Sequence, residues 1–260
     1  MRYLAGVSAH GTRYADLTPP GGPLALAALR ALGRQPTAAW AAWGVLLTAG
    51  MALDFSARAA GVDVGGDRAD AGLWAYSALE DALTAAVSGW ALCWLLTGAA
   101  PKGRGFGLFV MLLALTELYW DAAAQAFPGD EADTAEFLLG SLGAVLLIGG
   151  GVFVLTRLML WPIGGLIGDS VTPGVSWTRM EGQVLKYFAA VVLLTFPVML
   201  VNWTLFAQPI GRLGVSGSAE TIALDRVWST LETALATGVS AVMWRRRQGA
   251  TSERLGDVFA

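Results

Sequence analysis

Six stretches of this chain are apolar for about 20 residues, the length that an α-helix needs to cross the hydrocarbon core of a bilayer. They cover residues 37–55, 76–98, 106–122, 135–161, 184–206 and 224–244. The third stretch is the shortest and the fourth is the longest, so we expect tilt or a trimmed end there. The pattern predicts an all-α integral membrane protein with six transmembrane helices in one domain.

The charged residues between these stretches alternate in sign, and basic residues mark the cytoplasmic side of a membrane protein. The basic residues on one side are Arg2, Arg13, Arg30, Arg34, Lys102, Arg104, Arg157, Arg179, Lys186, Arg245, Arg246, Arg247 and Arg254. The connections on the other side carry Asp63, Asp67, Asp70, Asp130, Glu131, Asp133, Glu136, Glu220 and Asp225, against Arg58, Arg68, Arg212 and Arg226. We therefore expect both termini in the cytoplasm.

The residues before the first stretch predict a helix that lies on the membrane surface. Residues 23–34 are apolar at most positions and place Arg30 and Arg34 four residues apart, on one helical face. The segment is too short to span, so an interfacial helix fits it best. An extension of the first span is the alternative, which Gly33 and Pro36 oppose. The expected organisation is a flexible cytoplasmic N-terminus over 1–22, a membrane domain over 23–247 and a cytoplasmic tail over 248–260.

Composition supports the membrane class. Of 260 residues, 55% are hydrophobic and 14% are charged, whereas a soluble domain carries about 25% charged residues. The net charge of −3 comes without a basic stripe, which argues against a nucleic-acid partner. Lysine occurs only at Lys102 and Lys186, and Ala and Gly are abundant, as is typical of a GC-rich bacterial genome. We therefore expect a multi-pass protein of the bacterial inner membrane.

The sequence contains no recognisable catalytic motif. Cys93 is the single cysteine and His10 the single histidine, so an internal disulfide and a Cys/His zinc site are excluded. No Ser/His/Asp grouping and no phosphate-binding loop is present. We expect no catalytic residues, no metal, no cofactor and no enzymatic activity.

Carboxylates occur at membrane depth in the outer halves of the predicted spans, where an ionisable group costs several kcal/mol unless it is shielded. Glu232 is the clearest, because it lies about 10 Å below the outer end of the sixth span at 1.5 Å per residue. It shares one helical face with Ser229, Thr233, Ala236, Thr237 and Ser240. The second span carries a similar stripe of Ser77, Asp81, Thr84 and Ser88.

Two interpretations of the outer-half acids remain open. In the first, small and hydroxyl residues let the helices approach closely, and the carboxylates are protonated or paired. In the second, the acids line a vestibule that is open to the outside and attracts a cation or a basic group. The candidate vestibule residues are Glu80, Asp81, Glu117, Asp121 and Glu232. Arg226 lies near enough in the sequence to neutralise one carboxylate.

The segment from residue 157 to residue 197 carries a recognisable pattern. It reads TRLMLWP, then SWTRMEG after about a dozen residues, then KYF at the start of an apolar stretch. It resembles a large group of bacterial polytopic proteins related to the membrane domain of glycerophosphoryl diester phosphodiesterases. The matching positions are Arg157, Pro162, Ser176, Trp177, Gly182 and Phe188, and Met180 stands where a threonine is expected. The resemblance implies architecture without the catalytic domain, because no soluble segment here reaches the roughly 50 residues of a small domain.

The same segment predicts a helical elbow on the cytoplasmic surface between the fourth and fifth spans. Pro162 is expected to end the fourth helix, before a flexible turn that contains Gly164, Gly165, Gly168, Pro173 and Gly174. Ser176 is expected to be the N-cap of a short helix over 177–183, with Trp177 at headgroup depth. The elbow residues are Arg157, Pro162, Ser176, Trp177 and Gly182. The elbow is either a connector or a docking surface for a cytoplasmic partner or a lipid headgroup.

These patterns leave two main hypotheses about function, and a third, a membrane-embedded enzyme, lacks a base, a nucleophile or a metal set in the sequence. The first is a structural or accessory membrane protein that acts through lipids or through a membrane or cytoplasmic protein partner. The second is a transporter or channel-like protein for a small cation or polar solute, in which Glu232 and Glu117 are the main candidates. The two halves of the chain show no clear internal repeat, which counts against the usual plan of a secondary transporter.

Overall fold

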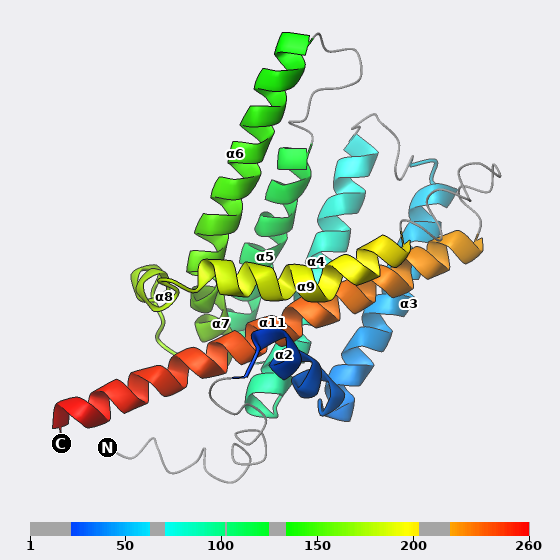
Figure 1. Cartoon of the computed structure of the whole chain (residues 1–260). Helices are drawn as coiled ribbons and strands as arrows, with labels where there is room; N and C mark the ends of the chain where they lie inside the picture. The colour runs from blue at the N-terminus through cyan, green and yellow to red at the C-terminus, as the bar shows by residue number, and fades with distance from the viewer. Residues whose placement is uncertain (1–21, 63–70, 102, 125–133, 203–218, 260) are drawn as a thin grey trace.

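The computed structural model describes residues 22–62, 71–101, 103–124, 134–202 and 219–259. Helices are the regular secondary structure throughout these ranges, which confirms the all-α prediction (Figure 1). They are α2 (Leu24–Gly33), α3 (Thr37–Ala59), α4 (Ala71–Thr97), α5 (Gly103–Ala124), α6 (Thr134–Leu158), α7 (Leu160–Ile167), α8 (Pro173–Arg179), α9 (Val184–Asn202) and α11 (Ala219–Phe259). The expected N-terminal tail lies outside the described residues apart from Gly22.

Four helical stretches within the described residues are long and apolar enough to cross a membrane. They are Thr37–Ala59, Ala71–Thr97, Phe137–Ile167 and Val184–Val201. α5 and α11 overlap the two remaining predicted spans but do not belong to this set. Both helices carry charged side chains, Arg104 and Glu117 on α5 and Glu220, Asp225, Arg226 and Glu232 on the first part of α11. Charged side chains lower the mean hydropathy of a helix even where they are shielded by its neighbours.

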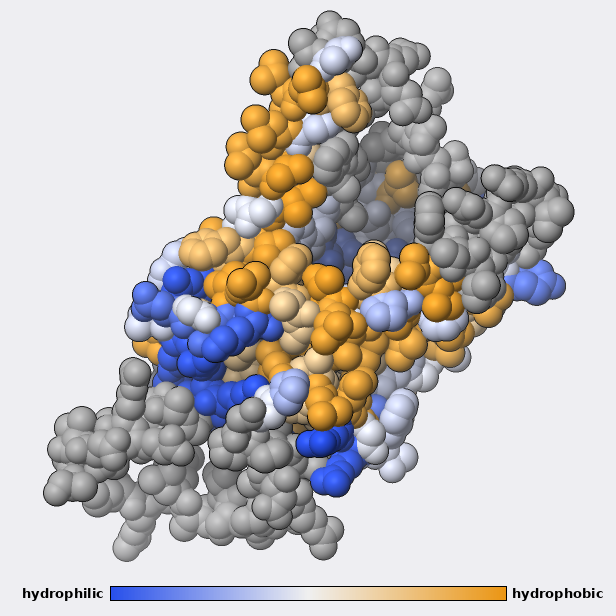
Figure 2. Space-filling view, in the orientation of Figure 1, coloured by the Kyte–Doolittle hydropathy of each residue, from blue (hydrophilic) through white to orange (hydrophobic). Residues whose placement is uncertain are grey.

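The apolar surface of two helices is almost fully exposed. In an apolar window of 18 residues within Phe137–Ile167, which contains most of α6, only 11% of residues are buried, and in such a window of α9 only 6%. Leu139 on α6 and Leu185 on α9 are 72% and 77% exposed. Figure 2 shows hydrophobic residues along α6 and over the face that α9 covers. A water-soluble protein rarely leaves a patch of this kind bare, so the structure fits a location in a bilayer.

The six long helices form two sets. Helices α3, α4, α5 and α6 follow one another up and down, with extensive contacts between α3 and α4 and between α4 and α5. Helices α9 and α11 form an antiparallel pair that runs across α4, α5 and α6 in the view of Figure 1. α2 packs on this pair through its buried alanines, and Gly238 of α11 makes room for Leu32.

A well-packed apolar core joins α4, α5, α7 and α11. Leu160, Met180 and Trp244 are almost completely buried in it. Two glycines allow the close packing there. A Cβ atom on Gly164 would lie 2.8 Å from the Cβ of Val171, and a Cβ atom on Gly105 would overlap the carbonyl group of Gly165.

The elbow differs from the sequence prediction in its helix boundaries. α6 ends at Leu158, three residues earlier than predicted, and Pro162 lies in the first turn of α7 and not directly after the end of α6. A proline is tolerated in a first turn, where the backbone N–H has no partner within the helix. The expected flexible turn is also wrong in part, because Gly164 and Gly165 are helical residues of α7. Gly182 has a φ of +66°, a left-handed conformation that glycine adopts without strain.

The predicted N-cap at Ser176 is wrong. Thr172 caps α8, and its hydroxyl group accepts a hydrogen bond of 3.3 Å from the N–H of Val175. Ser176 is completely buried inside α8, where its hydroxyl group accepts from the N–H of Leu160 at 3.1 Å and donates to the carbonyl of Arg157 at 2.8 Å. Both backbone groups flank the break between α6 and α7, so Ser176 satisfies groups that the break deprives of helical partners.

Candidate functional site

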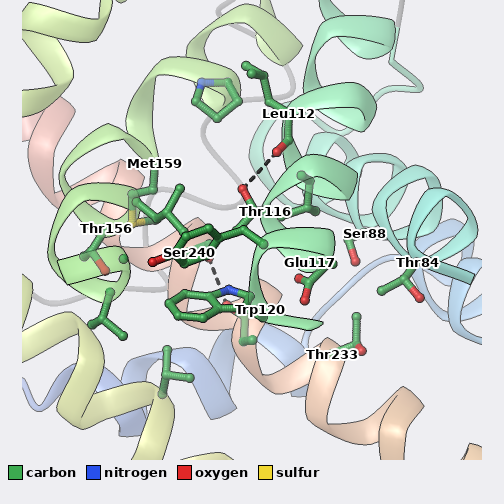
Figure 3. Close-up of a pocket in the computed structure, with 18 of the residues that line it drawn as sticks. Thr84, Ser88, Leu112, Thr116, Glu117, Trp120, Thr156, Met159, Thr233 and Ser240 are labelled. Carbon is green, nitrogen blue, oxygen red and sulfur yellow. Dashed lines mark hydrogen bonds between the residues drawn. The ribbon is translucent and has the colours of Figure 1, made fainter. Parts of the chain in front are cut away.

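A cavity of about 1060 Å³ lies between α4, α5, α6, α7, α9 and α11. Its polar side chains come mainly from α4, α5 and α11, and α6 and α7 contribute a largely apolar wall. Figure 3 shows Thr84, Ser88, Glu117 and Thr233 around one part of this space. In Figure 2 a hollow that contains hydrophilic residues lies beside α6.

The polar face of α11 forms one wall of the cavity. Residues Ser229, Glu232, Thr233, Ala236, Thr237 and Ser240 all line it, as expected for side chains three and four positions apart on one helix. From the stripe on α4, Asp81, Thr84 and Ser88 line the cavity, and Ser77 is not among the lining residues. α4 and α11 are in direct contact, so the two polar faces adjoin.

The structure brings four of the five candidate acids to this one cavity. Glu80, Asp81, Glu117 and Glu232 all line it, and the side chain of Asp121 lies outside the described part of α5. Glu232 is partly buried, and no hydrogen bond or ion pair reaches its carboxylate from the residues that the structure describes. A carboxylate placed in this way can take a cationic ligand.

Arg226 is the only basic residue among the described lining residues, and carboxylates already hold it. Its Nε donates to Oδ2 of Asp54 at 3.0 Å and its Nη2 to Oδ1 of Asp54 at 2.5 Å, a bidentate pair. Its Nη1 donates to Oε1 of Glu80 at 2.5 Å. The hydroxyl group of Tyr76 accepts from Nη2 at 3.2 Å and donates to Asp54 at 2.6 Å. We call these four residues, Asp54, Tyr76, Glu80 and Arg226, the arginine cluster.

Burial distinguishes the two carboxylates of the arginine cluster. The side chains of Arg226 and Asp54 are 6% and 9% exposed, whereas that of Glu80 is 29% exposed and faces the cavity. Gly50, one helical turn before Asp54, permits the close approach of Arg226. A Cβ atom at Gly50 would lie 2.7 Å from Cδ of Arg226. The pair with Asp54 is therefore a fixed part of the structure, and Glu80 is the partner that a ligand in the cavity can reach.

Sequence reasoning missed Asp54 and Tyr76. Asp54 stands at the end of the first apolar stretch, among residues whose pattern indicates only a membrane span. A signal was nevertheless present. Tyr76 precedes Glu80 by four residues, so both lie on one face of the same helix, and Gly50 precedes Asp54 by four, so a small residue lies beside the acid. Acids at membrane depth require an opposite charge, and Arg226 is a basic residue within a predicted span that carries such acids.

Aromatic side chains also border the cavity. Trp120 follows Glu117 by three residues on α5, and Figure 3 shows both side chains at the same space. Tyr119 stacks edge-on against Trp120, with ring centroids 5.1 Å apart, and its hydroxyl group donates to the carbonyl of Leu147 at 2.6 Å. The hydroxyl groups of Tyr187 and Ser240 share a hydrogen bond of 2.9 Å between α9 and α11.

The elbow forms a second cluster, around Arg157. The guanidinium carbon of Arg157 lies 5.3 Å from the ring centre of Phe153 and 5.2 Å from that of Trp177, and Nη1 donates to the carbonyl of Trp177 at 2.8 Å. The two rings meet edge to face at 5.8 Å. Trp177 is 38% exposed. Arg157 therefore connects the end of α6 to α8.

The chemistry of the cavity has to be inferred from its own residues. No group of three or more His, Cys, Asp or Glu side chains in the described part of the chain is arranged to hold a metal ion. The wall instead offers carboxylates, hydroxyl groups and aromatic rings beside an apolar surface. Comparisons with protein-family models, with curated proteins and with solved structures find no match to this chain.

Proposed function

We propose that this chain is a six-span protein of the bacterial inner membrane that binds a small cation, or a polar solute with a cationic group, in the cavity and moves it across the membrane. The observation that carries the proposal is the excess of carboxylates on the cavity wall. Glu80, Asp81, Glu117 and Glu232 line it, against Arg226 as the one basic residue among the lining residues that the structure describes. Arg226 is already engaged by Asp54 and Glu80.

The excess negative charge matters because the surroundings are apolar. Two unit charges 4 Å apart attract by about 4 kcal/mol at an effective dielectric constant of 20, against about 1 kcal/mol in water. An intramembrane carboxylate is costly to maintain, and such residues mark ion and substrate pathways. Glu232 fits this description best, since none of the described residues pairs with it and it faces the cavity.

The contacts at the two ends of the helices support the proposed orientation. Segments expected in the cytoplasm are linked at one end. Arg245 donates to the carbonyl of Leu95, Arg246 to the carbonyl of Gly22 at 2.7 Å, and Gln248 to Asp169 at 3.2 Å. The outer ends of α3, α4 and α11 are linked separately by the arginine cluster. Six spans with cytoplasmic termini require that successive helix ends lie alternately on the two faces of the membrane. In this arrangement α9 and α11 are tilted relative to the other four helices.

A flux measurement tests the proposed function. The protein is reconstituted in proteoliposomes, and uptake of alkali-metal ions and of small organic amines is followed with labelled solutes. Glu232→Gln and Glu117→Gln keep the shape of the side chain and remove its charge, so we expect each to lower uptake at least about tenfold. Glu181→Gln is the matched control, because Glu181 is exposed and does not line the cavity. Uptake that is unchanged in both cavity variants would overturn the proposal.

The second candidate function is a structural or accessory role through lipids or a protein partner. The exposed Trp177 and the bare apolar faces of α6 and α9 favour it. On this hypothesis the elbow lies at the cytoplasmic surface and the arginine cluster only holds helices together. A protein that shows no saturable uptake of any tested solute, yet folds and inserts normally, would support this role.

Reporter fusions test the topology independently of transport. Fusions at Asp67 and Glu131 are expected to report the outside, and fusions at Gly103 and after Arg247 the cytoplasm. An outside signal at Gly103 would contradict the six-span arrangement, because Lys102 and Arg104 set the orientation of that turn.

A further inference from the structure

We infer that the ligand of the cavity is an organic cation that carries an apolar group, such as a substituted ammonium, and not a bare metal ion. This inference rests on the proposed function, since it names the class of solute that the same cavity takes. Three features of the cavity lead to it: its size, the division of its wall into polar and apolar parts, and the aromatic rings beside its carboxylates.

The size of the cavity suits an organic molecule. Its volume of about 1060 Å³ is slightly above the range of pockets that bind small organic ligands, roughly 300–1000 Å³. A metal ion is instead held by several oxygen atoms that converge on one point at about 2.0–2.6 Å. The described residues contain no group of three carboxylate, histidine or cysteine ligands placed for this.

The wall of the cavity is divided by chemistry. α4 and α11 supply carboxylates and hydroxyl groups, among them Asp81, Glu232 and Thr233. The opposite wall is apolar over most of its extent, with Leu112, Leu113, Leu146, Leu155, Met159 and Ile163. A hydrated metal ion gains nothing from such a wall. A cation with aliphatic or aromatic substituents can place its charge on the polar side and bury its substituents on the other.

The aromatic rings complete the recognition of an organic cation. Trp120 stands one turn from Glu117 and opens on the same space (Figure 3). A tryptophan face attracts a substituted ammonium group through its quadrupole, and a neighbouring carboxylate supplies the opposite charge. Tyr119 is held edge-on to Trp120 and by its hydrogen bond to the carbonyl of Leu147, so the rings are positioned before a ligand arrives.

Binding of two ions of the same shape and opposite charge tests this inference. Labelled tetraphenylphosphonium and tetraphenylborate are titrated against the full-length protein in nanodiscs of neutral phosphatidylcholine, and binding to empty nanodiscs is subtracted. We expect saturable binding of the phosphonium alone. Glu117→Gln and Glu232→Gln are each expected to weaken it about tenfold, and Trp120→Leu about fivefold. Glu181→Gln should bind as the wild type does. Folding of every variant is checked by gel filtration and thermal unfolding.

Each outcome decides between this inference and the proposed function. Binding of phosphonium and borate with equal affinity would overturn the inference, because the cavity would then select for apolarity and not for charge. Saturable uptake of sodium or potassium ions in proteoliposomes, without phosphonium binding, would overturn the inference and leave the proposed function standing. A protein that neither binds the phosphonium nor takes up any cation would overturn both.

Discussion

Removal of Arg226 is expected to destabilise the protein more than any other single change in the arginine cluster. The Arg226→Met variant keeps an apolar side chain of similar length but leaves Asp54, with its side chain 9% exposed, as a buried charge without its partner. Breaking a buried ion pair in this way costs about 3–5 kcal/mol. Loss of the hydrogen bonds alone would cost far less, since such bonds between membrane helices average about 0.6 kcal/mol each. The uncompensated charge therefore dominates.

The order of stability among three variants tests this reasoning. Asp54→Asn leaves Arg226 paired with Glu80, so we expect a loss of only about 1–2 kcal/mol. The double variant Asp54→Asn/Arg226→Met removes the buried carboxylate together with its cation, and it should be more stable than Arg226→Met by about 1 kcal/mol or more. Arg58→Met is the matched control. Arg58 is exposed in the last turn of the same helix as Asp54, and the change should stay within about 0.5 kcal/mol.

The free energy of unfolding of these variants is measured by SDS titration in mixed micelles, with thermal unfolding in detergent as a second readout. Strictly additive losses in the double variant would refute the argument, because they would mean that the two side chains do not interact. A loss below about 1 kcal/mol for Arg226→Met would refute it as well, since a buried carboxylate without a cation costs more than that.

Three further changes test the packing. Gly50→Ala is expected to lower the free energy of unfolding by about 1–3 kcal/mol, because the new Cβ would overlap Arg226. Gly44→Ala on the same helix is the control. Gly44 has open space around it, so the change should be neutral or slightly stabilising in thermal unfolding. Gly105→Ala should prevent normal folding, as judged by gel filtration, because its Cβ would overlap a backbone carbonyl of α7, whereas Gly107→Ala has open space and should fold. Ser176→Ala should cost about 1–3 kcal/mol of unfolding free energy, because two buried backbone groups lose their partner; an unchanged unfolding midpoint would show that they find another.

Much of the helical framework could be predicted from the sequence. Each of the six apolar stretches contains a long helix, and α3 begins at Thr37, the first residue of its predicted span. The face of α11 that carries Glu232 could be predicted as well, because helical periodicity alone decides which side chains share a face. Local pattern is sufficient for such features, since they depend on residues a few positions apart.

Features that depend on packing could not be predicted in the same way. The pairing of Asp54 with Arg226 joins residues 172 positions apart and depends on how α3 and α11 meet. The role of Ser176 depends on a break between α6 and α7 that begins four residues before Pro162, and on the fold of the elbow that brings Ser176 to this break. A serine before a short helix is a common N-cap, but here tertiary hydrogen bonds to Arg157 and Leu160 determine its position.

The arginine cluster also sets an order of events during synthesis of the protein. Asp54 and Glu80 emerge from the ribosome 172 and 146 residues before Arg226. At about 5–20 residues per second, both acids exist for roughly 7–29 s before Arg226 is made. During that interval the two acids lack the arginine that holds them in the complete structure. A chain that stops before α11 never gains Arg226, so Asp54 and Glu80 stay without this partner. Their pairing therefore differs between an unfinished and a complete protein.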